Sequence, residues 1–339
     1  MDPSAPHSIV EIDGKRFDSW IGEDLLASSV ELTTDKTGEA TIELYDPTFK
    51  ILDGFLGGGA RALQAKFWYG WKKDVGNALF VGTLARVEWR DWTTTLRFHD
   101  FSSKMKQAKK TRYFKKKSDL QILRQLAADN QLQFSLKGNI ADGAPLDSLM
   151  QSGKTDWEMA LKIAERAGLR LYVRNDTLYA VEAGKTGIIA DGILTYEKDF
   201  TLLRGFNLGY KLPENKKGRA KKTEVRGRGR AGQRLTGTNN TGTNNGTTNL
   251  IVREDLPKPT VALLNRRAGG KSNRQREYAF EHHLQTLPNF ERIVELRSTL
   301  TLGGMGRFFG GNYLVTDIRY NFRPGKLTSE ITVGRDILR

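Results

Sequence analysis

Three side chains near the start of the stretch TDWEMALKIAERAGLRLYV (155–173) are of types that carry out acid and base chemistry. Thr155, Asp156 and Glu158 lie almost side by side, and a positioned carboxylate can act as a general base. The same spacing, S/T-x-x-E/Q, is also that of the capping box. In this motif the hydroxyl and the fourth side chain accept hydrogen bonds from free N–H groups at a helix start. Catalysis and capping are therefore competing interpretations.

An internal repeat favours capping. The segment SDLQILRQLAADNQLQFSL (118–136) aligns with this stretch at a constant offset of 37 residues. It has a hydroxyl at Ser118, and Gln121 stands where the later copy has Glu158. Gln121 caps a helix equally well but cannot act as a general base. Both copies continue with apolar residues at helical spacing and then with an alternating strand. We predict two helix–strand units, with Asp156 suited to the positive start of its helix.

The usual catalytic arrangements are missing. The sequence has no G-x-S-x-G, P-loop or H-E-x-x-H pattern, and it contains only four histidines. His282 and His283 are adjacent, but neighbours on the helix that we predict within 272–287 point in different directions, which disfavours a metal chelate. A pair of catalytic carboxylates stays open, because such pairs meet only in three dimensions. We predict no catalytic residues, no cofactor and no metal site.

Length and composition indicate a folded chain of more than one domain. A chain of 339 residues, 38% of them hydrophobic, exceeds one ordinary core. No apolar run is long enough to span a membrane, and the first residues lack the pattern of a signal peptide. We therefore expect no membrane anchor and synthesis in the cytoplasm. The lack of cysteine excludes disulfides and thiol catalysis.

The net charge of +15 comes from two short segments. Residues 104–117 contain eight Lys or Arg and no acid, and residues 211–234 contain ten with two acids, so each carries +8 and the remainder is about neutral. Basic segments bind nucleic acid or dock on acidic surfaces. No nucleic-acid-binding fold accompanies them, which favours a solvated loop or docking on an acidic protein surface. The candidate interface residues are Lys115, Lys116, Lys117, Arg226, Arg228 and Arg230.

Strand patterns flank the helix–strand units on both sides. Residues 8–100 and 290–336 contain short alternating segments that are rich in β-branched and aromatic residues and separated by turns. The end of the first part, VGTLARVEWRDWTTTLRFHD, echoes the end of the second, GGNYLVTDIRYNFRPGKLTSEITVGRD. We predict an α+β fold, mainly β, with two related β-barrel or sandwich domains on either side of a helix–strand repeat domain.

One segment fits neither pattern. Residues 213–250 combine a basic run with LTGTNNTGTNNGTTN, and such repeats bury too little apolar surface to offset the entropy of ordering. We predict a disordered loop between two strands of the second β-domain. The predicted domains are 1–105, 106–190 and 191–339, and the last contains the insert at about 213–250.

The order of these parts resembles that of a known family. In that family a segment D/S-x-W-x-x-A-x-x-I-A-x-x-x-G-L precedes a strand, and the chain closes with G-x-Y-x-V-x-x-I. Here the two patterns are filled by Trp157, Ala160, Ile163, Ala164, Gly168 and Leu169, and by Gly311, Tyr313, Val315 and Ile318. The chain resembles the central baseplate hub proteins of phage tails, the late-control-D group. It is also similar to the N-terminal half of the VgrG spike of type VI secretion. The resemblance covers most of residues 8–336, except the insert.

This resemblance implies a structural protein of the virion and not an enzyme. Hub proteins form homotrimers, in which the two tube-like β-domains of each chain make a pseudo-sixfold ring. The ring adapts a hexameric tail tube to a trimeric spike and nucleates tube assembly. The implied partners are the tail tube, spike or tip, baseplate wedge and tape-measure proteins, with nucleic acid present only as the genome passing through the lumen. Neither the insert nor the basic segments belong to the family pattern.

Two alternative functions stay open. A nucleic-acid-binding protein acting through residues 104–117 and 211–234 would bind generic DNA or RNA with a steep dependence on salt. A tail-associated cell-wall hydrolase would cleave peptidoglycan, and substitution of a single Asp or Glu would abolish the activity.

Overall fold

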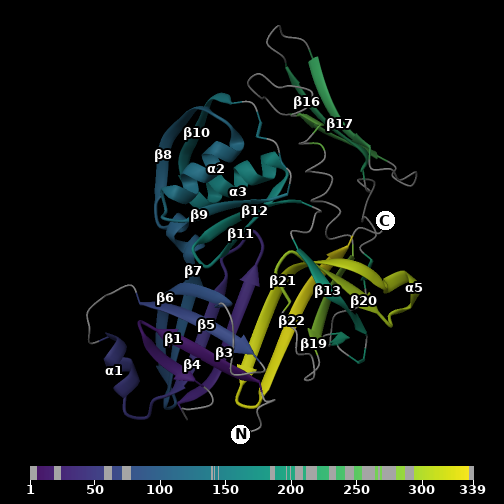
Figure 1. The fold of residues 1–339 in the computed structure, drawn as a ribbon. Helices are drawn as coiled ribbons and strands as arrows, with labels where there is room; N and C mark the ends of the chain where they lie inside the picture. Colours follow the sequence, from purple (N-terminus) through teal and green to yellow (C-terminus); the bar gives the residue numbers. More distant parts are fainter. Residues whose placement is uncertain are drawn as a thin grey trace.

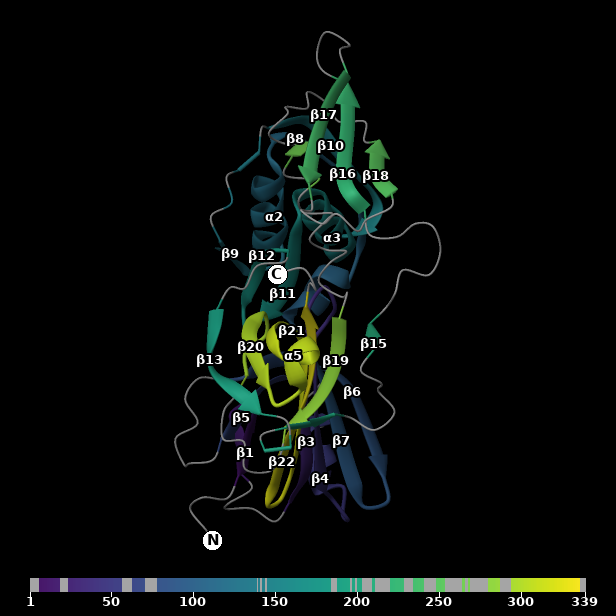
Figure 2. The ribbon, with the colours of Figure 1, turned by 90° about the vertical axis from the view of Figure 1, so that its right-hand side faces the viewer.

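The computed structural model describes residues 6–18, 24–56, 63–70, 78–138, 140, 142–143, 145–183, 188–195, 197–198, 200–202, 209–210, 220–228, 234–240, 248–253, 264–265, 268, 280–286 and 294–335. In this part of the chain the fold is α+β and mainly β, as predicted (Figure 1). Two β-domains lie side by side, and the helix–strand domain lies at one end of them (Figures 1 and 2).

Seven strands build the first β-domain. Their buried apolar and exposed polar residues alternate, as a sheet with one covered face requires. They are β1 (His7–Ile12), β2 (Lys15–Asp18), β3 (Leu25–Thr33), β4 (Glu39–Tyr45), β5 (Gln64–Gly70), β6 (Phe80–Arg90) and β7 (Thr93–Asp100). They pair in the order β3-β4-β7-β6-β5-β1-β2. The helix α1 (Lys50–Leu56) lies between β4 and β5, and the 3-10 helix η1 (Phe101–Lys106) follows β7.

The helix–strand domain contains two β-α-β units, so each unit has one strand more than the sequence predicted. The first is β8 (Lys109–Lys117), α2 (Asp119–Ala128) and β9 (Gln133–Lys137). The second is β10 (Leu146–Thr155), α3 (Asp156–Ala167) and β11 (Leu169–Arg174), followed by β12 (Thr177–Glu182). β8 pairs with β10, whereas β9 and β11 pair with opposite edges of β12. The two helices pack over a separate core, in which Ile122 and Ile163 are buried.

The second β-domain repeats the order of strands in the first, with two differences. It contains β13 (Ile188–Thr195), β14 (Phe200–Leu202), β15 (Gly209–Tyr210), β19 (Phe280–Thr286), β20 (Ser298–Gly303), α5 (Gly306–Phe309), β21 (Gly311–Arg323) and β22 (Lys326–Arg335). Its strands pair as β14-β19-β22-β21-β20-β13, which corresponds to β3-β4-β7-β6-β5-β1. β13 runs parallel to β20, whereas β1 runs antiparallel to β5, and β2 has no counterpart among the described strands. The hairpins β6–β7 and β21–β22 each contain one shift of register, after Leu84 and after Val315. The predicted relation between the two β-domains is confirmed.

Two stretches differ from the prediction. The helix predicted within 272–287 is wrong for residues 280–286, which form β19, because pairing with β22 overrides the local helical pattern. The prediction of a disordered insert does not hold for β16 (Ala220–Arg228), β17 (Arg234–Asn240) and β18 (Thr248–Arg253). These three strands form a small separate sheet, in the order β17-β16-β18 (Figure 2). Their Thr and Val residues favour strands, and mutual pairing satisfies backbone groups without a large core.

A single long strand joins the two β-domains into one sheet (Figure 1). The first half of β21 pairs with β20, and its second half pairs along the same edge with β3. The register of β21 shifts at Thr316, between these two halves. There the hydroxyl of Thr34 donates a hydrogen bond of 2.8 Å to the carbonyl of Thr316, so a residue next to β3 holds the branch point.

One apolar core spans the junction. The ring of Tyr69 on β5 lies 6.1 Å from that of Tyr320 and 6.2 Å from that of Phe322, both on β21. The Tyr69 hydroxyl donates to the Ser28 Oγ (3.1 Å), and the Tyr320 hydroxyl donates to the carbonyl of Val294 (2.6 Å). The two β-domains therefore share backbone pairing, aromatic packing and hydrogen bonds.

Candidate assembly surfaces

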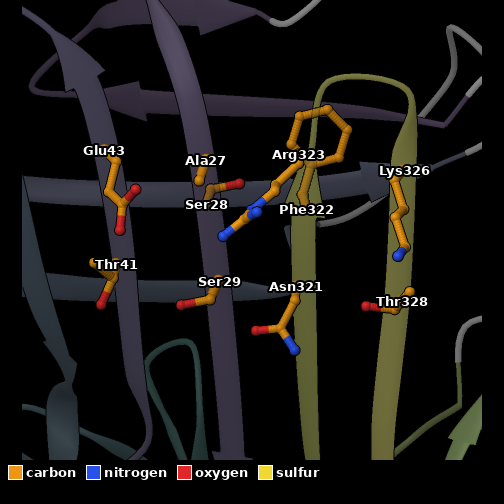
Figure 3. A pocket seen from close by; sticks show the side chains of 10 residues that line it. All are labelled: Ala27, Ser28, Ser29, Thr41, Glu43, Asn321, Phe322, Arg323, Lys326 and Thr328. Atoms are coloured by element: carbon orange, nitrogen blue, oxygen red, sulfur yellow. The ribbon is translucent and has the colours of Figure 1, made fainter.

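One face of the joined sheet is polar and continuous across the junction (Figure 3). Alternate residues of β4, β3, β21 and β22 point away from the core. The register places Thr41 opposite Ser29, Ser29 opposite Asn321, and Asn321 opposite Thr328. A single row of hydroxyl and amide side chains therefore crosses four strands and both β-domains.

A shallow pocket of about 360 Å³ lies on this face. Arg323 and Lys326 stand at its β21–β22 side, and Glu43 stands on the other side (Figure 3). The pocket is lined by Ala27, Ser28, Ser29, Thr41, Glu43, Asn321, Phe322, Arg323, Lys326 and Thr328. The lining contains no histidine that could activate its serines. The pocket therefore presents mainly hydroxyl, amide and charged side chains.

Some of the charges on the polar face are paired across neighbouring strands. Arg319 on β21 lies 3.3 Å from Glu31 on β3, which makes an ion pair across the junction. Glu31 stands opposite Glu39, and His99 lies 3.4 Å from the Glu39 carboxylate. Glu31 and Glu39 therefore lie side by side, and each has a basic side chain, Arg319 or His99, on the side away from the other carboxylate. The face combines charges of both signs and does not form a basic or acidic strip.

The first candidate group, at the start of α3, forms a helix cap. The Thr155 hydroxyl accepts from the Glu158 N–H (3.2 Å), and the Glu158 carboxylate accepts from the Thr155 N–H (2.7 Å). This second bond holds the pKa of the Glu158 carboxyl below its ordinary value. Ser118 and Gln121 form the same reciprocal pair at the start of α2. The predicted capping boxes are confirmed in both copies.

Asp156 has a larger structural role than its sequence position indicated. Its side chain is only 1% exposed and accepts hydrogen bonds from Lys110 (2.6 Å), Arg112 (2.8 Å), Gln151 (2.9 Å) and Asn130 (2.9 Å). Burial opposes ionisation, but these hydrogen bonds and the nearby guanidinium outweigh it and hold the Asp156 pKa below its ordinary value. The carboxylate therefore ties β8, β10 and the end of α2 to the start of α3.

The internal repeat indicates the role of Asp156 in joining the two units. The earlier copy has Asp119 at the same helix position, where it is also buried and pairs with Arg166 of α3. A carboxylate present in both copies therefore joins the two units. Sequence reasoning assigned Asp156 only to the helix dipole, because its four partners come from elements that are distant along the chain.

The basic segment 104–117 is not a uniformly free strip. Lys110 and Arg112 are bound to Asp156, and Lys117 donates to the Gln125 side chain (2.6 Å). Lys115 and Lys116 are exposed on β8. Of the three lysines predicted as interface residues, two are therefore exposed at the surface and one is engaged within the domain.

Two exposed apolar side chains lie next to these lysines. Tyr113 of β8 stands opposite Met150 of β10, and they are 59% and 42% exposed. Lys115 stands opposite Ser148 in the same register. Exposed apolar side chains and exposed lysines therefore lie together on this part of β8 and β10.

The arginine candidates lie elsewhere. Arg226 and Arg228 belong to β16, opposite Thr236 and Arg234 of β17, and Arg230 lies outside the described residues. β16 and β8 belong to different sheets. The structure therefore does not place the two predicted basic groups on one common sheet.

The adjacent histidines alternate along β19. His282 is buried and lies 3.0 Å from the Tyr313 hydroxyl, whereas the His283 ring is 3.1 Å from the Thr332 hydroxyl. Successive residues of a strand point to opposite faces, so the two rings diverge. Among the described residues no cluster of three or more His, Asp or Glu is arranged to hold a metal ion. No helix in the described part is long and apolar enough to cross a membrane.

Sequence reasoning missed an exposed aromatic cluster at the β6–β7 turn. The rings of Phe49 and Trp89 stack at 4.5 Å, and those of Trp89 and Trp92 meet at 6.4 Å. Trp92 is 59% exposed and has a positive φ of 65°, a strained backbone conformation for a bulky residue. The signal was the two tryptophans of EWRDWT, one at the end of β6 and one in the turn itself. Exposed clusters of this kind mark interaction surfaces.

No known family profile matches the sequence, and no curated protein matches it. Solved structures do match. The 43 kDa tail protein of prophage MuSo2 from Shewanella oneidensis has a TM-score of 0.69 at 14% identity and covers 98% of both chains. A tail protein from Neisseria meningitidis has a TM-score of 0.68 at 12% identity, covering 98% of this chain and 97% of its own.

A third match comes from type VI secretion. The E. coli c3393 protein, described as a component of that system with structural similarity to T4 phage tail proteins, has a TM-score of 0.61 at 10% identity. It covers 96% of this chain and 76% of its own. The predicted resemblance is therefore confirmed at the level of fold: this chain has the fold of phage tail proteins and of VgrG-like proteins of type VI secretion.

Proposed function

We propose that this protein is the structural hub of the baseplate in a phage or phage-like contractile tail. Three copies form a ring that adapts the hexameric tail tube to a trimeric spike and nucleates tube assembly. The observation that carries this proposal is the repeated strand order of two β-domains within one continuous sheet. Three such chains supply six equivalent domains, which is the number that a sixfold tube presents to its neighbour.

The polar face suits the lumen of such a ring. Its rows of hydroxyl and amide groups stay hydrated, and Arg319 is paired with Glu31. Hydroxyl and amide groups carry no charge and do not hold DNA by releasing counterions, so these rows would let a genome pass without retaining it. The remaining partners that we propose are the spike or tip, wedge and tape-measure proteins. Their site of assembly is the virion, after synthesis in the host bacterial cytoplasm.

The proposed role is not enzymatic. The acid and base candidates at the start of α3 are occupied by capping and by an ion-pair network. The fold matches are tail and secretion proteins, which also disfavours the cell-wall hydrolase. The nucleic-acid alternative loses support because Lys110 and Arg112 are bound within the domain.

The proposal predicts the mass of the particle in solution. We expect light scattering to give a mass of three chains, at low and at high salt and after nuclease treatment, because a ring held by β-strand and apolar contacts is insensitive to screening. A monomer that keeps nucleic acid until the salt is raised would support the nucleic-acid alternative. A monomer free of nucleic acid that also fails to form a ring with a co-expressed spike protein would overturn the hub proposal.

A second prediction concerns the lysines that remain free on β8. We propose that Lys115 and Lys116 bind an acidic surface of a spike, wedge or tape-measure protein. Lys115→Glu/Lys116→Glu is expected to reduce co-purification of tail proteins with the tagged chain at least about tenfold, which is about 1.4 kcal/mol, and to leave the melting temperature unchanged. The matched control is Lys36→Glu/Lys162→Glu, which reverses two exposed charges elsewhere. Equal recovery of tail proteins with both variants would show that this surface is not used.

A further inference from the structure

We propose that the outer edge of β6, from Ala85 to Arg90, pairs with the edge formed by β14 and β15 of a second copy of this chain. The inference rests on the proposed ring and specifies which two edges close it. It follows from the internal repeat, because one of the two β-domains shows how an equivalent edge is covered.

The covered edge is that of β21. Its first half pairs with β20, with Leu314 opposite Thr299. After the shift of register at Thr316, the second half of β21 pairs with β3. The neighbouring β-domain therefore continues the sheet beyond the point where β20 stops covering the edge of β21.

β6 has the counterpart of the β20 pairing but lacks a counterpart of the β3 pairing. It pairs with β5, with Thr83 opposite Gln64, and then its register shifts after Leu84. From Ala85 to Arg90 no strand among the described residues lies along the edge that β5 has covered. By the internal repeat, this is the edge to which a further β-domain attaches.

The complementary edge is that of β14 and β15. Both strands pair with β19 as β3 pairs with β4: Leu202 stands opposite Leu284, as Ser28 stands opposite Ile42. Gly209 stands opposite Glu281 of β19, as Glu31 stands opposite Glu39. β14 and β15 thus replace β3 in the second β-domain, and their outer edge pairs with no strand in the described part of the chain.

The repeat also fixes the register. Within the chain Arg319 stands opposite Glu31, and Ile318 stands opposite Leu32. On β6, Glu88 corresponds to Arg319 and Val87 to Ile318. On β15, Gly209 corresponds to Glu31 and Tyr210 to Leu32. Between two copies we therefore expect Glu88 opposite Gly209 and Val87 opposite Tyr210.

Burial supports this assignment. Ile318 and Tyr320 face the core and are each 1% exposed. Their counterparts Val87 and Trp89 are half-buried or exposed, and Trp89 is 36% exposed. Apolar side chains are thus left partly open on β6 at positions that the neighbouring domain covers on β21. The exposed cluster of Trp89 and Trp92 continues this uncovered surface.

The free edge is also protected in the single chain. Charged side chains alternate with the apolar ones along β6, and those of Arg86 and Glu88 pair with each other. Charges on an edge strand disfavour uncontrolled pairing. Because the two edges are different surfaces on different β-domains, the contact is head to tail, and such a contact closes into a ring when the rotation between copies divides a full turn.

Cysteine cross-linking tests this pairing, and the chain contains no native cysteine that would interfere. Glu88→Cys/Gly209→Cys is expected to give covalent dimers and trimers on a non-reducing gel, because opposite strand positions lie close enough for a disulfide. Arg319→Cys/Glu31→Cys tests the known register and is expected to cross-link within one chain. Arg86→Cys/Gly209→Cys is displaced by one repeat of the strand and is expected to cross-link at least about tenfold less, since disulfide geometry is specific.

The outcomes separate this inference from the proposed ring. A trimer in light scattering whose Glu88→Cys/Gly209→Cys variant stays uncross-linked, while Arg319→Cys/Glu31→Cys cross-links, would overturn the β6 pairing and leave the ring. Val87→Cys/Tyr210→Cys is the second pair, for use if Gly209→Cys impairs folding. Single chains in both measurements, with the internal control intact, would count against the ring and this pairing together.

Discussion

Replacing Asp156 with alanine is expected to lower the free energy of unfolding by about 3–5 kcal/mol. The carboxylate is buried and accepts from Lys110, Arg112, Gln151 and Asn130. Its removal leaves the Lys110 ammonium without this counter-charge and the Arg112 guanidinium with Asp129 alone, at positions that are only partly exposed. Urea denaturation of the whole chain, followed by circular dichroism, measures this loss.

The neighbouring cap provides the matched control. Glu158→Gln keeps the hydrogen-bonding geometry that Gln121 shows in the other copy, and the side chain lies at the surface. We expect this variant to change the free energy of unfolding by less than about 0.5 kcal/mol. Equal effects of Asp156→Ala and Glu158→Gln would contradict the role of the buried carboxylate in joining the two units.

The Asp156 network also predicts a dependence on pH. The folded pKa of this carboxyl lies below its ordinary value, so the folded state binds its proton more weakly than the unfolded chain does. Its stabilising contribution is therefore complete above the unfolded pKa of about 3.9 and is lost as the pH falls through the folded pKa. The difference in stability between the native chain and Asp156→Ala should be constant near neutral pH and should shrink in this acidic range.

The second large effect is expected at the junction of the β-domains. Phe322 is only 1% exposed, and its ring lies 6.2 Å from that of Tyr69. Phe322→Ala is expected to lower the free energy of unfolding by about 3–5 kcal/mol through lost burial and the cavity left behind. Because this ring packs where β21 meets β3, we also expect the two β-domains to unfold in separate calorimetric transitions.

Leu26→Ala is the control for this substitution. Leu26 lies on β3 near the same junction but is 38% exposed, so its truncation should cost no more than about 1 kcal/mol. A Phe322→Ala variant that unfolds in the same single transition as the native chain, with a loss as small as that of Leu26→Ala, would show that the junction does not depend on this aromatic packing.

Local patterns were sufficient for much of the fold. The capping boxes at Ser118 and Thr155 marked both helix starts, because capping depends on residues within one turn. Alternation marked the strands of both β-domains, because one face of each strand meets a core. The segment 280–286 was misjudged for the same reason, since its local spacing favoured a helix while its partner β22 lies far along the chain.

The candidate surfaces were less predictable. The sequence identified Lys115, Lys116 and Lys117 as one basic group, but it did not show that Lys117 donates to Gln125 or that Asp156 neutralises neighbours of this group. It also gave no sign that β3 pairs with β21, because strand pairing at such separation leaves no local pattern. A surface formed by strands that are distant in sequence can be identified only from the folded structure.

The strand shared by the two β-domains has a consequence for folding. Thr34 and Thr316, which meet at the branch point, are 282 residues apart in sequence. During synthesis one edge of β3 therefore stays uncovered until β21 has left the ribosome. Formation of a contact between residues so distant in sequence is slow. An interrupted chain would expose this edge to aggregation. Only chains translated through β21 can therefore complete the sheet and present its finished surface to neighbouring chains.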